Sequence, residues 1–201
     1  MARPGAPAEP PRDHAGPVLL VATVASFVTP FMGSSVAIAL PAISRAFTLD
    51  AVAVGWLVTA YLLAAAAALV PVGRLADLHG RNRVFSLGLV LFSLASLACG
   101  LSPGVGWLVA ARILQGLGGA MVFGTRVAMV SAAYPAGRRG RAIGVTVSAV
   151  YVGLSIGPLV GGVLTSRFGW RSIFHVGAVV GAVAAAVAFS RLERGRPPID
   201  P

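Results

Sequence analysis

The feature that most constrains the fold of this chain is a series of long runs that contain no charged residue. Five such runs lie between Asp13 and Arg45, Asp50 and Arg74, Arg83 and Arg112, Arg141 and Arg167, and Arg171 and Arg191. The turn sequence LSPGVG at 101–106 interrupts the third run, and a further apolar stretch continues from there to about Ala133. Each stretch reaches or nearly reaches the roughly 20 residues that a helix needs to cross about 30 Å of hydrocarbon. Because a backbone in lipid must satisfy its own hydrogen bonds, the sequence predicts an all-α membrane protein.

We predict six transmembrane helices in one domain over residues 17–190. The expected spans are 17–43, 51–73, 84–101, 106–133, 142–165 and 172–190. The flanking residues 1–16 and 191–201 are predicted to be tails, and the first of these is expected to be disordered because it is polar and rich in proline.

The arginines indicate how the chain crosses the membrane. Eleven of them lie in the two tails and in the joints near 74–83 and 138–141, whereas only Arg45, Arg167 and Arg171 lie in the other joints. The positive-inside rule therefore predicts that both termini face the cytoplasm. We expect a multi-pass protein of the cell inner (plasma) membrane. The net charge of +10 does not indicate nucleic acid as a partner, because the arginines sit at the ends of apolar runs and form no continuous stripe.

An internal repeat is visible around two of the joints. The stretch GRLADLHGRNRVF at 73–85 shares two glycines, a leucine and a phenylalanine with GVLTSRFGWRSIF at 162–174, each 89 positions further along the chain. A weaker match relates GSSVAI, from Gly33, to GTRVAM, from Gly124. Copies of three spans must enter the membrane in opposite directions, so the pattern predicts a 3+3 inverted repeat, which is typical of transporters. The alternative is that small apolar helices resemble one another by composition alone.

Three stretches carry recognisable motifs: GRLADLHGR at 73–81, RILQGLGGA at 112–120 and GVTVSAVYVGLSIGPLVGG at 144–162. Together they resemble the motifs of a major facilitator superfamily transporter, and of its fourteen-span multidrug/proton antiporter branch in particular. The stretch GRLADLHGR is similar to the superfamily's loop between spans 2 and 3, through Gly73, Leu75, Ala76, Asp77, Gly80 and Arg81. RILQGLGGA resembles its span 4 motif through Arg112, Gln115, Gly116 and Gly119. GVTVSAVYVGLSIGPLVGG resembles its span 5 antiporter motif through Gly144, Gly153, Gly157, Pro158, Gly161 and Gly162.

The resemblance implies the N-terminal half of a transporter that exports small lipophilic compounds or drugs by secondary transport. Its partners would be the lipid bilayer, a small-molecule substrate and a second six-span half, which is either another copy or a separate chain. Two alternatives stay open: a truncated gene product, and a membrane interaction subunit without transport activity. No alternative is an enzyme, because the sequence has no GxxxxGK[ST] phosphate loop and no His/Cys/acid cluster with metal-ligand spacing. We therefore expect no cofactor and no metal.

The resemblance also assigns roles to these residues. Gly73, Asp77, Gly80 and Arg81 would form a cytoplasmic loop that locks one state of alternating access; the alternative is a solvated turn with anchoring arginines. The span 5 glycines recur every four residues on one face, which favours close helix packing, and Pro158 is expected to kink that span. The resemblance adds to that span a role in antiport and in sealing the cavity.

The arginines inside span 4 suggest further functions. Arg112, with Gln115 on the same face, is expected either to face a substrate cavity or to snorkel to the outer interface. Arg126 is expected near the cytoplasmic end of its span, within reach of Asp77. Met32 stands where the fourteen-span branch often has an aspartate, and no acid lies inside any of the six predicted spans. A proton-coupling carboxylate is therefore not expected in this chain, unless Asp77 serves from the loop.

Overall fold

The computed structural model describes residues 15–192, which form six helices and contain no strand. These are α1 (Ala15–Phe47), α2 (Ala51–His79), α3 (Arg81–Gly100), α4 (Val105–Ala133), α5 (Ala136–Phe168) and α6 (Arg171–Leu192). All six are long and apolar enough to cross a membrane. The predicted all-α fold with six transmembrane helices is confirmed.

Several helices extend beyond the expected spans. α5 begins at Ala136 rather than at 142, so the arginines at 138–141 lie in its first turns and not in a loop. At 1.5 Å per residue its 33 residues are about 50 Å long, more than the hydrocarbon requires. Charged residues mark the edge of the apolar region and not the end of the helix. The predicted tails lie outside the described residues, apart from Ala15 and Gly16 in α1 and Arg191 and Leu192 in α6.

Two glycines set the sharp joints of the bundle. Gly80, with φ +91°, ends α2 and donates its N–H to the Ala76 carbonyl; Gly169, with φ +80°, ends α5 and donates to the Thr165 carbonyl. In the part of the chain that the structure describes, no other glycine has a positive φ. The two glycines are the pair that the internal repeat aligns, so the repeat is preserved in the backbone.

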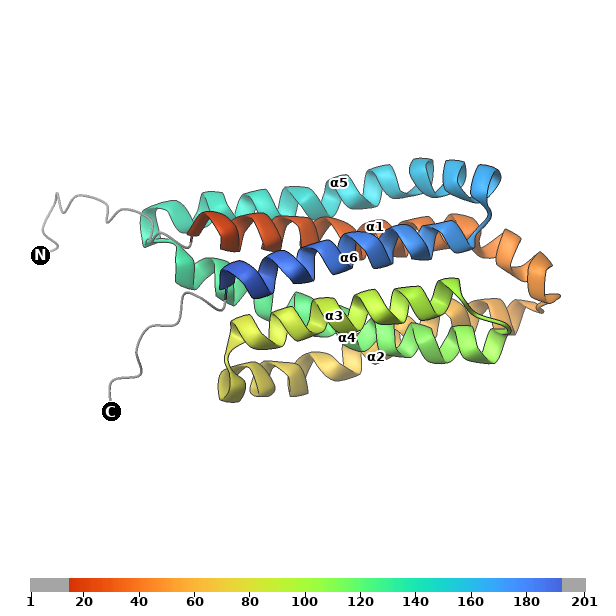
Figure 1. Cartoon of the computed structure of the whole chain (residues 1–201), viewed down its shortest axis with the longest axis horizontal. Coiled ribbons are helices and arrows are strands. Elements are labelled where there is room, and N and C mark those ends of the chain that lie inside the picture. Colours follow the sequence, from red (N-terminus) through yellow and green to blue (C-terminus); the bar gives the residue numbers. More distant parts are fainter. Residues whose placement is uncertain (1–14, 193–201) are drawn as a thin grey trace, which may run out of the picture.

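The contacts between helices follow the same repeat, in which α1, α2 and α3 correspond to α4, α5 and α6. α1 packs against α5 and α6, and its counterpart α4 packs against α2 and α3, the counterparts of α5 and α6. α3 packs against its own counterpart α6, and Figure 1 shows α2 and α5 at opposite edges of the bundle. This is the arrangement expected of a 3+3 inverted repeat.

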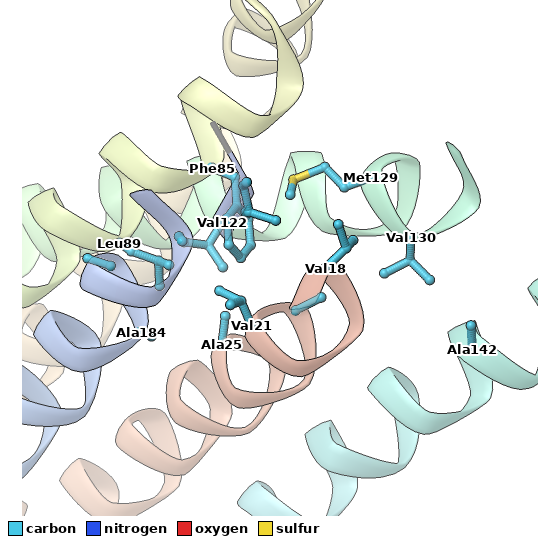
Figure 2. Close-up of a cluster of buried hydrophobic side chains, with 14 residues drawn as sticks. Val18, Val21, Ala25, Phe85, Leu89, Val122, Met129, Val130, Ala142 and Ala184 are labelled. Atoms are coloured by element: carbon cyan, nitrogen blue, oxygen red, sulfur yellow. The ribbon is translucent and has the colours of Figure 1, made fainter. Parts of the chain in front are cut away.

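Apolar side chains of five helices form the interior at the end of the bundle where α1 begins. Figure 2 shows this cluster, which includes Val18, Val21 and Ala25 of α1, Phe85 and Leu89 of α3, Val122, Met129 and Val130 of α4, Ala142 of α5 and Ala184 of α6. A second cluster, around Phe31, Phe92 and Phe174, continues the interior toward the other end.

α2 and α5 are largely exposed along their length, in contrast to α1 and α3. Leu62, Leu63 and Val70 of α2 and Tyr151 and Leu159 of α5 are among the exposed large apolar side chains. These faces suit lipid or another apolar protein surface and not water.

Candidate functional site

An apolar cavity of about 410 Å³ lies between α1, α2, α4 and α5. Its lining consists of Thr29, Pro30, Gly33 and Ser34 of α1, Tyr61, Leu62, Ala65, Ala66 and Leu69 of α2, Gly119, Ala120 and Phe123 of α4, and Leu154 of α5. None of these residues is charged, and the only polar side chains are three hydroxyls. A cavity of this volume and composition fits a small lipophilic molecule.

Arg112 is buried, contacts Tyr61 of the cavity lining, and is hydrogen-bonded to α2 and to its own helix α4. Its Nε donates a 3.0 Å hydrogen bond to the Leu57 carbonyl of α2, and its Nη1 donates to Oε1 of Gln115. The guanidinium carbon lies 4.3 Å from the centroid of the Tyr61 ring. Gln115 in turn donates from Nε2 to Oγ of Ser96 on α3, at 2.7 Å. Arg112 and Gln115 therefore join α2, α3 and α4 in one hydrogen-bonded network.

The structure excludes one of the two sequence-based expectations for Arg112, that its side chain snorkels to the interface. Its side chain is 2% exposed, so it does not snorkel to the interface. It is not among the residues that line the cavity; Tyr61 lines the cavity and also contacts the guanidinium. Tyr61 therefore connects the cavity lining to the buried arginine.

The segment predicted as a gating loop is almost entirely helical. Gly73 and Asp77 belong to the last two turns of α2, Arg81 is the first residue of α3, and only Gly80 separates the two helices. Nη2 of Arg81 lies 3.2 Å from Oδ1 of Asp77, and both side chains are exposed, at 48% and 67%. The turn at Gly80 brings the first residue of α3 back beside the last turn of α2, so the pair joins the ends of two helices.

Arg126 does not reach Asp77. Its Nη1 donates a 2.8 Å hydrogen bond to Oγ of Ser26 on α1, and the side chain is only 6% exposed. The sequence-based expectation of a contact with Asp77 was wrong because α4 turns this side chain toward α1 and away from the end of α2.

The span 5 glycines lie against α1. A methyl group on Gly157 would overlap the Ser34 side chain, and one on Gly161 would lie 2.7 Å from Cβ of Ser35. Oγ of Ser35 donates a 2.9 Å hydrogen bond to the Gly157 carbonyl. Gly153 makes a similar backbone approach to Phe27 of the same helix.

Pro158 and Gly162 of the same motif lie differently. α5 runs as one helix across Pro158, without interruption. Nothing but a methyl group of Ile38, at 3.9 Å, lies within 4 Å of where a Cβ on Gly162 would be. Three glycines of the motif thus form the close contact, and Gly162 lies beside it.

Sequence reasoning did not single out Tyr61, Phe123 or Ser26. Ser26 could have been found as a polar side chain in a charge-free span, because such side chains tend to face the interior of a bundle. For the two aromatic residues the sequence offers no such signal, because an aromatic side chain in a membrane span can also face lipid.

Comparison with known proteins gives a consistent family. The family model described as Major Facilitator Superfamily matches residues 22–201. The riboflavin transporter RibZ of Clostridioides difficile (strain 630) is 34% identical over 177 residues, which cover 88% of this chain and 39% of that protein. The multidrug resistance protein Stp of Mycobacterium tuberculosis (strain CDC 1551 / Oshkosh) is 41% identical over 157 residues, which cover 78% and 29%.

Other relatives and solved structures agree. The tetracenomycin C resistance and export protein of Streptomyces glaucescens is 35% identical over 182 residues, which cover 90% of this chain and 34% of that protein. A D-xylose-proton symporter structure superposes with a TM-score of 0.78 at 16% identity, over 89% of this chain and 48% of the symporter. The chain thus spans about a third of the length of these curated relatives and about half of the solved structure.

Proposed function

The chain belongs to the Major Facilitator Superfamily, and on that premise we propose that it forms one half of a secondary transporter that exports small lipophilic compounds. The observation that carries the proposal is the uncharged cavity between α1, α2, α4 and α5. Such a cavity binds by apolar contact and offers a few hydroxyls for orientation, which suits chemically varied lipophilic molecules. The names of the relatives support export, since two of the three are resistance proteins.

A second six-helix unit belongs to the proposal. The exposed apolar faces of α2 and α5, two of the helices that line the cavity, have no partner among residues 15–192. A second half packed on these faces would close the cavity into a central site near the bilayer midplane. That half could come from another copy of this chain or from other polypeptide sequence.

We further propose that both termini face the cytoplasm and that the α2–α3 joint controls opening on that side. The arginine bias supports the orientation. The exposed Asp77–Arg81 pair supports a role of this joint in opening and closing, because an ion pair between two helix ends can exchange partners with a neighbouring half when the helices move. Of the two acids among residues 15–192, Asp50 caps the start of α2 and Asp77 lies in its last turn. A proton-carrying carboxylate near the cavity would therefore be contributed by the second half.

A matched pair of substitutions on α2 tests the cavity. Ala66 lines the cavity, and the exposed Ala67 does not. Efflux of the neutral dye Nile red would be measured in cells that lack their own pumps and express the protein. We expect Ala66→Trp to abolish efflux and Ala67→Trp to leave it largely intact. Equal loss from both variants, at equal membrane abundance, would contradict a substrate site in this cavity.

A further inference from the structure

A second buried arginine, Arg126 on α4, makes few of the contacts that a buried guanidinium needs. Of its five N–H donors, the structure pairs one: Nη1 donates to Oγ of Ser26. The Nε is buried and has no hydrogen-bond partner among the described residues. Ser26 donates its own hydrogen to the Ala22 carbonyl at 2.6 Å, so its hydroxyl oxygen is fixed as an acceptor.

The contrast with Arg112 on the same helix shows that this arrangement is unusual. Arg112 is similarly buried, but it donates to a carbonyl from Nε and to Gln115 from Nη1. Arg126 has no carbonyl acceptor and no amide, and the only ion pair within residues 15–192 is the exposed Arg81–Asp77 pair. A guanidinium held in a membrane domain without a counter-charge is costly, and such residues commonly belong to a binding or transport site.

Arg126 contacts a side chain that lines the apolar cavity. The guanidinium carbon is 3.9 Å from the centroid of the Phe123 ring, and Phe123 lines the cavity with 48% of its surface exposed. Thr29, one turn from Ser26 on α1, lines the cavity as well. On α4, Val122, Met129 and Val130 flank Arg126 and join the apolar cluster in Figure 2, which supplies no anion. One aromatic side chain therefore separates the cavity from an incompletely paired positive charge.

We propose that Arg126 is an anion-binding residue of this cavity, and that the compounds it takes include apolar molecules that carry one carboxylate. The apolar body occupies the cavity, and the carboxylate reaches the guanidinium when Phe123 changes rotamer. A guanidinium binds a carboxylate through two parallel charge-assisted hydrogen bonds, which would use the free Nε. Ser26 holds the guanidinium in place. The inference rests on the proposed transporter function and names a substrate class for that same cavity.

The test compares two ligands of equal shape and different charge. Radiolabelled 2-naphthoate and its neutral analogue 2-naphthamide are equilibrated by dialysis against the full chain in nanodiscs of zwitterionic lipid, with empty nanodiscs as background. We expect the wild-type protein to bind the carboxylate at least about tenfold more tightly, the effect of one or two charged hydrogen bonds. Arg126→Gln should remove that preference and leave binding of the amide unchanged.

Two further variants control the result. Arg138→Gln removes an exposed arginine from the first turns of α5 and should preserve the preference, which separates local binding from surface charge. Ser26→Ala should weaken the preference in part, and it provides a second reading if Arg126→Gln does not fold.

The outcomes separate this inference from the function on which it rests. Equal binding of both ligands to the wild type, or a preference that survives Arg126→Gln, overturns the anion site and leaves the apolar cavity as a transport site. If the wild type binds neither ligand above background, the proposed cavity function fails, and the inference fails with it.

Discussion

Ser35 of α1 donates a 2.9 Å hydrogen bond to the carbonyl oxygen of Gly157 on α5, where the two helices leave no space for an added methyl group. In lipid, helices associate through close packing and interhelical hydrogen bonds, since apolar burial distinguishes little between protein and lipid. The contact therefore attaches the edge helix α5 to α1, and it depends on glycine at 157 and 161.

The first prediction uses two adjacent glycines of α5. Gly161→Ala places a Cβ 2.7 Å from that of Ser35 and should destabilise the protein by about 1–3 kcal/mol, the usual cost of overpacking. Gly162→Ala has room and should be neutral or stabilising by about 0.5–1 kcal/mol, because alanine favours a helix. Thermal unfolding in detergent would measure both. A larger loss at position 162 than at 161 would contradict the observed α1–α5 contact.

The second prediction concerns the two joint glycines. Gly80 and Gly169 adopt φ of +91° and +80° with extended ψ, a region open almost only to glycine. Alanine at either position should cost about 1–3 kcal/mol, and the two losses should be similar because the repeat gives both joints the same backbone. Gly73→Ala, inside α2 with open space around it, is the control and should be tolerated. Stability measured by chemical denaturation would compare the three.

The third prediction separates stability from conformational control at the α2–α3 joint. Because the Asp77–Arg81 pair is exposed, Asp77→Asn should change the free energy of unfolding by less than about 1 kcal/mol. If the joint locks one state, the same variant should change the rate at which a maleimide labels a cysteine introduced at Ala66 in the cavity, after Cys99→Ala. An unchanged labelling rate would support the solvated-turn alternative.

The fourth prediction concerns the Arg112 network. Gln115→Leu leaves the guanidinium with one side-chain acceptor fewer and should cost about 1.5–3 kcal/mol, the range for hydrogen bonds to charged groups. Ser96→Ala removes only the neutral bond to Gln115 and should cost about 1 kcal/mol. The exposed neighbour Leu114→Ala provides the baseline in the same unfolding assay. Equal effects of all three variants would mean that the network contributes nothing specific.

The fifth prediction tests orientation. Thr48 and Arg139 are exposed at opposite ends of the bundle. In a Cys99→Ala background, a membrane-impermeant maleimide added to intact cells should label Thr48→Cys and should label Arg139→Cys only after permeabilisation. The reverse pattern would place the termini outside the cytoplasm and contradict the arginine-based orientation.

The membrane-spanning architecture could be predicted from the sequence because it depends on length and composition. Six apolar stretches dictate six helices in a solvent that offers the backbone no hydrogen bonds. The repeat was also readable, because Gly80 and Gly169 must both be glycine to adopt their backbone geometry. Helix ends were less predictable, since a helix such as α5 continues past the charged residues that mark the edge of the apolar region.

The sequence by itself therefore determined how many helices cross the membrane, where they reverse, and which stretches resemble transporter motifs. Only the tertiary structure decided which side chains meet. Spans that are apolar around their whole circumference carry little sign of which face lies inside, so neither the cavity beside Tyr61 and Phe123 nor the partner of each arginine follows from periodicity. Arg112 and Arg126 look alike in the sequence, yet packing gives the first a carbonyl and an amide and gives the second only the hydroxyl of Ser26.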